Sequence, residues 1–468
     1  MKHTEKIGKE KVGKLLFNFS IPSIIGMLVM ASYNVVDRIF VGRGVGALAL
    51  SGIAITFPLF IILMGFGLLI GIGSTALVSI KLGEGNLDEA ERTTGNALSM
   101  SLIISVTLMT TGWIFLVPLL KLLGAQGEVF VYAKQYMELV LLGTIFQTIA
   151  YSMNSIIRGE GNPKISMLTM IISAVLNAIL NPIFIFGLHL GVKGSALSTI
   201  ISQFVGSVWI MNYFFSKKST IKLRLKNLAL QLDIVKKIFF IGVSPFVMQL
   251  ASSVVIMIAN RNLEVYGGDI AIAALAIIYS VFMIIFMPVL GINQGLQPIV
   301  GYNYGATQYQ RVLRALKLGL ISASAICAGG FLLIMIFDKS IVMLFSSNEM
   351  NLITMTVHGL KIQLLTLPIV GITVITSSYF QAVGKPRFSI ILTLLRQVIL
   401  IIPLLLILPK FLKLDGVWVA TPISDGFTSL LAIIFLFFEI RRLKGKQFQE
   451  LKTQPVIIEN NQPETIPD

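Results

Sequence analysis

Long, unbroken apolar runs constrain this chain more than any other feature of its sequence. Runs such as 53–80 and 390–408 lack the strict alternation of apolar and polar residues that the strands of a membrane β-barrel require. A helix crosses a bilayer with about 20 apolar residues, and twelve segments meet this requirement. Because 55% of the residues are hydrophobic and only 13% are charged, an ordinary soluble chain is excluded. The sequence therefore predicts an all-α membrane protein with twelve transmembrane helices.

The twelve expected spans leave only short connections, apart from two tails and one central linker. The spans are expected at 15–41, 50–80, 94–118, 130–156, 166–187, 193–216, 238–262, 271–300, 313–337, 353–381, 388–408 and 416–440. They form two sets of six, within 15–216 and 238–440, on either side of the basic linker 217–237. Residues 1–14 form an N-terminal tail, and the polar tail 441–468 is expected to be disordered.

Basic residues are distributed unevenly between the two ends of the expected spans. The formal net charge is +15, and of the 37 Lys and Arg residues 26 fall on the side that carries both termini, against 10 on the opposite side. Loops rich in Lys and Arg stay on the cytoplasmic side of a membrane. We therefore expect a multi-pass protein of the inner (cytoplasmic) cell membrane with both termini in the cytoplasm. Since the positive charge lies where insertion needs it, we do not expect a nucleic-acid partner.

The two sets of six spans are related to each other at an offset of 223 residues. This offset pairs Pro22 with Pro245, Asp37 with Asn260, Arg38 with Arg261, Gly161 with Gly384, Pro163 with Pro386 and Ser166 with Ser389. An even number of spans separates equivalent points, so the two repeats have the same orientation. Parallel repeats imply a pseudo-two-fold axis along the membrane normal and a substrate held between two lobes, an arrangement common among transporters.

Polar residues inside the N-terminal spans fall on narrow helical faces. A polar group in hydrocarbon is costly, so we expect these side chains to face the interior, where they either join helices or line a water-filled cavity. The faces contain Tyr33, Asn34 and Asp37 in the first span, Gln147, Tyr151 and Asn154 in the fourth, Asn177 and Asn181 in the fifth, and Ser195, Thr199 and Gln203 in the sixth.

Asp37 is the carboxylate on these faces. Burial of a carboxylate costs more than burial of a hydroxyl, so Asp37 is expected to bind a cation or to take up a proton. The alternatives are a structural salt bridge with Arg38 or a position at the membrane interface. Pro22 lies two to three turns before Tyr33 in the same span and can bend it.

The C-terminal half has Asn260 in place of that carboxylate. Asp425 and Arg396 lie inside the last two spans, where they either pair as a structural bridge or take part in transport. Further pocket candidates are two amides and two methionines, since thioethers adapt to irregular shapes. They are Gln294, Gln297, Met283 and Met287. Helix packing is the alternative explanation for each of them.

The sequence gives no indication of a cofactor or of a metal cluster. Cys327 is the single cysteine, and His3, His189 and His358 lie far apart. The glycine-rich segment 42–46 lies between two spans rather than after a strand, as a nucleotide loop would. Without an ATPase signature, the energy must come from an ion gradient or from the gradient of the substrate. An intramembrane transferase or protease needs a nucleophile beside a buried base, and His358 has no obvious partner, so we do not expect an enzyme.

Taken together, these segments resemble the multidrug and toxic compound extrusion (MATE) family, and within it the bacterial and archaeal DinF-like subgroup. The resemblance covers about residues 10–445 and rests on several motifs. These are IPSIIG and YNVVDRIFVG in the first span, RGEGNPK after the fourth, LNAILNP in the fifth, PIVGYNYGA after the eighth and QAVGKP after the tenth. The resemblance implies two six-helix lobes around a V-shaped central cavity and cation-coupled export by alternating access.

The resemblance also implies a cation site, built from an aspartate in the first span, an asparagine and an aspartate one turn apart in the fifth, and a threonine in the sixth. The matching positions are Asp37, Asn177, Asn181 and Thr199, with Tyr33, Tyr136 and Asn154 shaping the pocket and Pro22 as the hinge. Asn181 departs from the family pattern. One carboxylate instead of two halves the formal negative charge that could hold sodium, so a proton is favoured over sodium.

The expected function is therefore an antiporter that exports amphipathic, often cationic, small molecules in exchange for a proton or a sodium ion. A natural metabolite stays open as the substrate. A monomer in the bilayer suffices, because one chain contains both lobes. The alternative is a flippase for a lipid-linked precursor, a function that the superfamily includes. A flippase needs cationic groups for a pyrophosphate, and Arg396 and Lys361 are the candidates.

Overall fold

The fold is helical throughout the part of the chain that the structure, a computed structural model, describes, which is residues 2–345 and 349–453. No strand occurs within these ranges. The first six spans follow the expected order, and each begins one to seven residues before its predicted start. They are α2 (Val12–Gly44), α3 (Ala47–Gly83), α4 (Leu87–Ile114), α6 (Gly127–Gly159), α7 (Pro163–Pro182) with the π-helix η1 (Ile183–Gly187), and α8 (Val192–Phe215).

The next six spans are less regular, because several run into one another or bend. They are formed by α9 (Leu232–Gly305), α10 (Tyr309–Met343), α11 (Met350–Gln363), α12 (Leu367–Ala382), α13 (Pro386–Leu394), the π-helix η3 (Leu395–Ile401) and α14 (Ile402–Thr453). Helix α9 contains two spans that meet at Gly268, whose φ is 64°. Helix α14 is broken in the same way at Lys413, with a φ of 50°. Together α11 and α12 make one span that is bent by 51°.

These breaks bring the number of apolar spans within the described residues to twelve, so the predicted fold class is confirmed. Among the described residues, nine helices and one bent pair are long and apolar enough to cross a membrane, and two of the nine each contain a break between two spans. Three expectations need correction. The span expected at 353–381 is two helices, the tail 1–14 contains a helix, α1 (Lys2–Lys9), and the first part of the tail, 441–453, is helical rather than disordered. Residues 454–468 lie outside the described residues.

Two shorter elements complete the chain. Helix α5 (Leu116–Leu122) follows α4, and a 3-10 helix, η2 (Leu225–Leu228), lies in the linker before α9.

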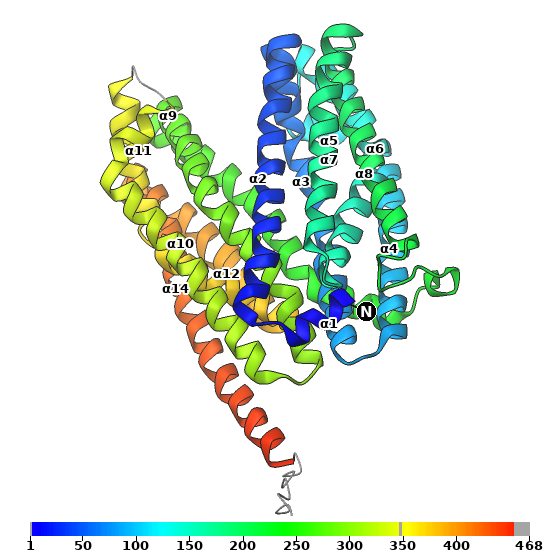
Figure 1. The fold of residues 1–468 in the computed structure, drawn as a ribbon. Helices are drawn as coiled ribbons and strands as arrows, with labels where there is room; N and C mark the ends of the chain where they lie inside the picture. The colour runs from blue at the N-terminus through cyan, green and yellow to red at the C-terminus, as the bar shows by residue number, and fades with distance from the viewer. Residues whose placement is uncertain (1, 346–348, 454–468) are drawn as a thin grey trace, which may run out of the picture.

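Figure 1 shows the helices in two groups, α2–α8 and α9–α14, which we call the N-lobe and the C-lobe. The groups lie together at the end that carries α1 and diverge at the opposite end. We call these the closed end and the open end.

Glycines bring the main chains of the two lobes into direct contact toward the closed end. A Cβ atom on Gly242 would lie 1.9 Å from the carbonyl oxygen of Leu69, and one on Gly73 would lie 2.1 Å from that of Ile238. A side chain at either position would therefore force α3 and α9 apart. The same pattern recurs further along these helices, where Gly83 approaches the carbonyl oxygen of Tyr302. We call this contact between α3 and α9 the glycine seam.

The repeat seen in the sequence has a physical counterpart in the two lobes. In the N-lobe, Nη1 of Arg158 donates a hydrogen bond of 2.8 Å to Oγ of Ser166. In the C-lobe, Nε2 of Gln381 donates one of 2.8 Å to Oγ of Ser389. Each C-lobe residue stands 223 positions after its N-lobe counterpart. The same hydrogen bond between two consecutive spans thus occurs in both lobes, with the amide of Gln381 in place of the guanidinium of Arg158.

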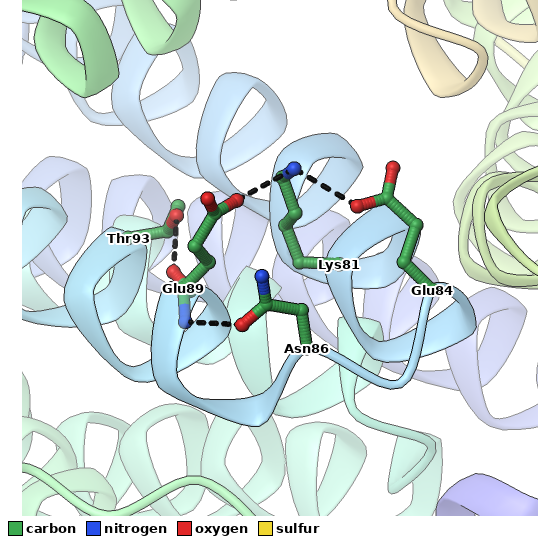
Figure 2. Close-up of polar contacts among 5 residues, drawn as sticks. All are labelled: Lys81, Glu84, Asn86, Glu89 and Thr93. Carbon is green, nitrogen blue, oxygen red and sulfur yellow. Dashed lines mark hydrogen bonds and ion pairs between the residues drawn. The ribbon is translucent and has the colours of Figure 1, made fainter.

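Figure 2 shows the turn between α3 and α4, which is one of the sharp connections between helices at the closed end. Gly85 has a φ of 75°, a conformation that favours glycine. The next residue, Asn86, caps α4 by accepting a hydrogen bond of 3.1 Å from the backbone N–H of Glu89. Lys81 lies between the carboxylates of Glu84 and Glu89, at 2.9 and 2.6 Å. The same four residues, GEGN, recur at 159–162, where Gly161 also has a positive φ, 110°, but Asn162 makes no side-chain cap to α7.

Candidate functional site

Asp37 lies in a closed polar network between three helices of the N-lobe. Its side chain is 8% exposed. Oδ1 of Asp37 accepts a hydrogen bond of 2.8 Å from Nδ2 of Asn181 on α7 and one of 2.9 Å from Oγ of Ser195 on α8. Among the described residues, no Lys or Arg side chain pairs with it; Arg38 is exposed and its guanidinium lies 5.5 Å from the ring centre of Phe57. The alternative of a salt bridge with Arg38 is therefore wrong.

The network continues from Asn181 along the facing sides of α7 and α8. Nδ2 of Asn181 also donates to Oδ1 of Asn177 at 2.8 Å, and Oγ of Ser198 donates to Oδ1 of Asn181 at 2.6 Å. Nδ2 of Asn177 lies 3.2 Å from both Oγ of Ser198 and Oγ1 of Thr199. Thr199 in turn shares a hydrogen bond of 3.2 Å with the hydroxyl of Tyr33 on α2. The structure thus brings together all four residues predicted for the coupling site.

Local sequence explains why these groups converge. Asn177 and Asn181 are one turn apart on α7 and both are buried, and Tyr33 and Asp37 have the same spacing on α2. Directly after Asn181, Pro182 lacks an N–H to donate, and the chain continues as the π-helix η1. Such π-helical turns often adjoin functional sites. Asn34 also lies on α2, but its side chain is outside the part of the molecule that the structure describes.

Two serines of the network were not among the predicted coupling residues: Ser195, which lies on the polar face predicted for the sixth span, and Ser198, which was not predicted. Both are fully buried, and each bonds to a predicted site residue on another helix. The only signal in the sequence is their spacing, because residues 195, 198 and 199 share one face of α8. This signal alone does not separate them from hydroxyls that bond within their own helix.

Helix α6 contributes the remaining N-lobe candidates. Tyr136 is buried, and Tyr151 is partly buried. Gln147 and Asn154 are also buried. Their Nε2 and Oδ1 atoms, respectively, have no hydrogen-bond partner among the described residues. Such groups can bond to a bound molecule or to water.

The C-lobe candidates do not gather into a matching site. Asn260, Met283 and Met287 are partly exposed on α9, and no described contact joins them to the polar network of the N-lobe. Nε2 of Gln294 points to the sulfur of Met27 at 3.2 Å, and Nε2 of Gln297 lies 3.3 Å from the carbonyl oxygen of Ile72. These two glutamines therefore bond across the boundary between the lobes.

Arg396 and Asp425 form an ion pair inside the C-lobe. Nε of Arg396 lies 2.5 Å from Oδ1 of Asp425, with side chains 16% and 5% exposed. Oγ of Ser424 donates to the carbonyl oxygen of Arg396 at 2.8 Å, and Arg396 lies in the π-helix η3. The predicted pairing is thus present. Lys361 is paired as well, at 2.7 Å from Oδ2 of Asp338.

The coupling site, as arranged, does not fit a sodium ion. Sodium is a hard cation that prefers several oxygen ligands, but Asn181 turns its N–H groups, not its oxygen, toward Asp37 and Asn177. Every polar group of Asn177 and Asn181 is already used within the network. A carboxyl group that gains or loses a proton needs no such rearrangement.

Comparison with known proteins places the chain in a family. The sequence profile described as MatE matches residues 22–183 and 241–407. The multidrug export protein MepA of Staphylococcus haemolyticus is 28% identical over 433 residues, which cover 92% of this chain and 95% of that protein. MepA of Staphylococcus aureus is 27% identical over 435 residues, which cover 93% and 96% of the two chains.

Solved structures agree with this placement. A MATE structure in complex with MaL6 superposes with a TM-score of 0.89 at 26% identity, covering 95% of this chain and all of that one. A transporter of the MOP superfamily from Pyrococcus furiosus, described as having a binding pocket of reversed polarity, gives a TM-score of 0.88 at 26% identity and covers 95% and 99%. With a family match over most of its length and the same fold of twelve spans in two lobes, the chain belongs to the MATE family of membrane transporters.

Proposed function

We propose that this protein is a multidrug exporter that exchanges its substrates for protons. The bacterial relatives named as multidrug export proteins support drugs as the substrates. We expect these to be amphipathic, often cationic, small molecules. The observation that carries the coupling is the environment of Asp37, a buried carboxylate bonded only to neutral donors among the described residues. A carboxylate without a cationic partner in a membrane interior is a group whose charge is used in function.

The chemical step assigned to Asp37 is the uptake and release of one proton. When Asp37 is charged, the hydrogen bonds from Asn181 and Ser195 favour the carboxylate. A proton that arrives from the outside neutralises it and weakens these bonds, so α2 loses part of its attachment to α7 and α8. Substrate and proton then compete through one conformational equilibrium, as alternating access requires.

Helix α2 is suited to transmit this change because its two ends belong to different lobes. Near the closed end, Phe19 is buried in the hydrophobic cluster of the C-lobe, and Ile24 lies against Gly291 of α9. Toward the open end, Gly26 lies against Met170 of α7, and Asp37 bonds to Asn181. The contacts pass from one lobe to the other within about one turn of Pro22, as expected of the predicted hinge.

The energy of the exchange depends on its stoichiometry. If one monovalent organic cation leaves for each proton that enters, no net charge moves, and only the chemical gradient of the proton drives export. A neutral substrate adds about 2.3 kcal/mol for each 100 mV of membrane potential. A single titrating carboxylate supports one proton per cycle.

The test replaces the coupling group. Asp37→Asn keeps the size of the side chain and removes its titration, so we expect a folded protein that exports no ethidium from proteoliposomes under an imposed pH gradient. Arg38→Gln is the matched control, because Arg38 is adjacent but exposed, and it should export at the rate of the unmodified protein. Wild-type export by the Asp37→Asn variant would remove Asp37 from the mechanism.

The runner-up function, a flippase for a lipid-linked precursor, is less well supported. Both cationic candidates for a pyrophosphate are neutralised, Arg396 by Asp425 and Lys361 by Asp338. A pyrophosphate would have to compete with these carboxylates. Headgroup translocation of a fluorescent lipid-linked pyrophosphate, measured in the same proteoliposomes, separates the two functions.

The placement in the cell follows from the same proposal. We infer that the closed end faces the cytoplasm, since it carries α1 and the end of α14 and the larger share of Lys and Arg. The chain then lies in the inner (cytoplasmic) membrane with its open end toward the outside. One chain holds both lobes, so a monomer is sufficient.

A further inference from the structure

The N-terminal helix α1 lies under the closed end and touches both lobes. We call residues 4–10, that is α1 from Thr4 onward and Glu10, the strap. Ile7 is fully buried within the hydrophobic cluster of the C-lobe. An eight-residue helix is not stable alone in water, so these tertiary contacts hold it in place.

At one end, the strap is attached to the N-lobe by a single side chain. Oγ1 of Thr4 donates to the carbonyl oxygen of Glu160, just after α6, at 3.0 Å and lies 3.2 Å from Oγ1 of Thr220. Thr220 itself is fixed to the N-lobe, because the neighbouring Ser219 and the backbone N–H of Ile221 donate to the carboxylate of Glu160 at 3.0 and 3.2 Å. Burial raises the pKa of the Glu160 carboxyl, and these donors oppose that effect.

At the other end, the strap is attached to the C-lobe by several groups. Nη2 of Arg311, on α10, donates to the carbonyl oxygens of Ile7 and Glu10 at 2.8 and 2.7 Å. Nδ2 of Asn303, on α9, lies 3.3 Å from the carbonyl oxygen of Ile7, and its Oδ1 accepts from Nε of Arg311 at 2.7 Å. Hydrogen bonds from a charged donor are stronger than neutral ones, so this attachment is the firmer of the two.

We propose that the strap is a releasable clamp that holds the closed end shut. Opening this end moves the two lobes apart, and the strap cannot then keep both attachments. Because the N-lobe attachment depends on Thr4 and the C-lobe attachment on Arg311, Asn303 and the buried Ile7, the Thr4 contacts break first. The strap then stays on the C-lobe until closure restores its bonds with Glu160 and Thr220. This proposal rests on alternating access, but not on which ion drives it.

The experiment measures the opening itself. Spin labels at Lys164 and Arg387 report on the separation of the lobes, since both residues are exposed and follow α6 and α12 at equivalent positions of the repeat. The labels are attached to Lys164→Cys and Arg387→Cys in a Cys327→Ala background. Thr4→Val removes the hydroxyl and should increase the ratio of open to closed distances by about five-fold, the factor for one net hydrogen bond. Thr4→Ser should restore the original ratio.

A matched control separates the clamp from a general loss of structure. Thr93 is buried near the same end, but its hydroxyl bonds only within its own helix, to the carbonyl oxygen of Glu89 at 2.8 Å. Thr93→Val should leave the distances unchanged. Identical distance distributions for Thr4→Val and the unmodified protein would overturn the proposal. Because the readout needs no substrate or gradient, failure of proton coupling would not affect it.

Discussion

At the scale of the residue, the side chains that donate hydrogen bonds to Asp37 are neutral and lie on other helices. The sequence predicted Asp37, Asn177, Asn181 and Thr199 as one site, and the structure places them together. Ser195 and Ser198 could not be predicted as securely. A serine in an apolar helix commonly bonds to the carbonyl oxygen four residues earlier, as Ser252 does. Nothing local distinguishes such a serine from one that bonds across to another helix.

Asn181→Asp tests the choice between proton and sodium. The variant gains a second carboxylate next to Asp37, which restores the charge that two acidic residues would offer to a cation. In the unmodified protein, we expect ethidium export driven by an imposed sodium gradient to lie close to the rate of empty vesicles. In the variant, this export should rise at least about ten-fold, the factor that corresponds to about 1.4 kcal/mol of ion affinity. Asn177→Asp is the matched control within the same network. Sodium-driven export by the unmodified protein at the rate of its proton-driven export would contradict the proposed ion.

The pair of Arg396 and Asp425 is expected to be structural. Removing one partner leaves the other charge buried and unpaired. Because Arg396 is 16% exposed, water reduces this cost, and we expect Arg396→Gln or Asp425→Asn to lower the free energy of unfolding by about 2–3 kcal/mol. The double variant Arg396→Met with Asp425→Leu should lie closer to the unmodified protein. Chemical unfolding in detergent micelles measures both. A double variant that is stable but exports nothing would instead assign the pair to transport.

At the scale of the element, hydropathy located the spans, but not every break in them. The separations at Gly268 and Lys413 coincide with the gaps between expected spans, whereas the bend between α11 and α12 was not predicted. Its signal is Pro368, at the start of α12, since proline disfavours helix interiors. Helix α1 was missed because its residues are polar, and its stability comes from contacts with distant parts of the chain.

The glycine seam allows a prediction for α9. Gly242→Ala places a methyl group 1.9 Å from the carbonyl oxygen of Leu69, so α3 and α9 must move apart. We expect the spin-labelled pair at Lys164 and Arg387 to shift toward longer distances, together with a lower free energy of unfolding. Gly426→Ala is the control, because no atom lies within 4 Å of its added Cβ, and alanine favours helix by up to about 1 kcal/mol. A Gly242→Ala variant as stable and as closed as the control would refute the importance of the seam.

At the scale of the whole molecule, the repeat predicted two related lobes, but it could not predict how they meet. The equivalent joints at Ser166 and Ser389 follow the offset in the sequence. The functional groups do not follow it, because Asn260 replaces the carboxylate and the C-lobe contains an ion pair instead. The contact between the lobes depends on main-chain approaches and on α1, which leave no periodic pattern. In addition, the sequence of a transporter must be compatible with at least two conformations, and the contacts between the lobes differ from one conformation to the other.

The glycine seam has a further consequence for the speed of the cycle. A surface made largely of peptide groups has few rotamers to order when its two sides meet, so rejoining costs little side-chain entropy. Interdigitated leucines would instead have to disengage and repack at every turnover. Docking of the lobes should then be rapid, and the slow step of export would fall to proton exchange or to departure of the drug.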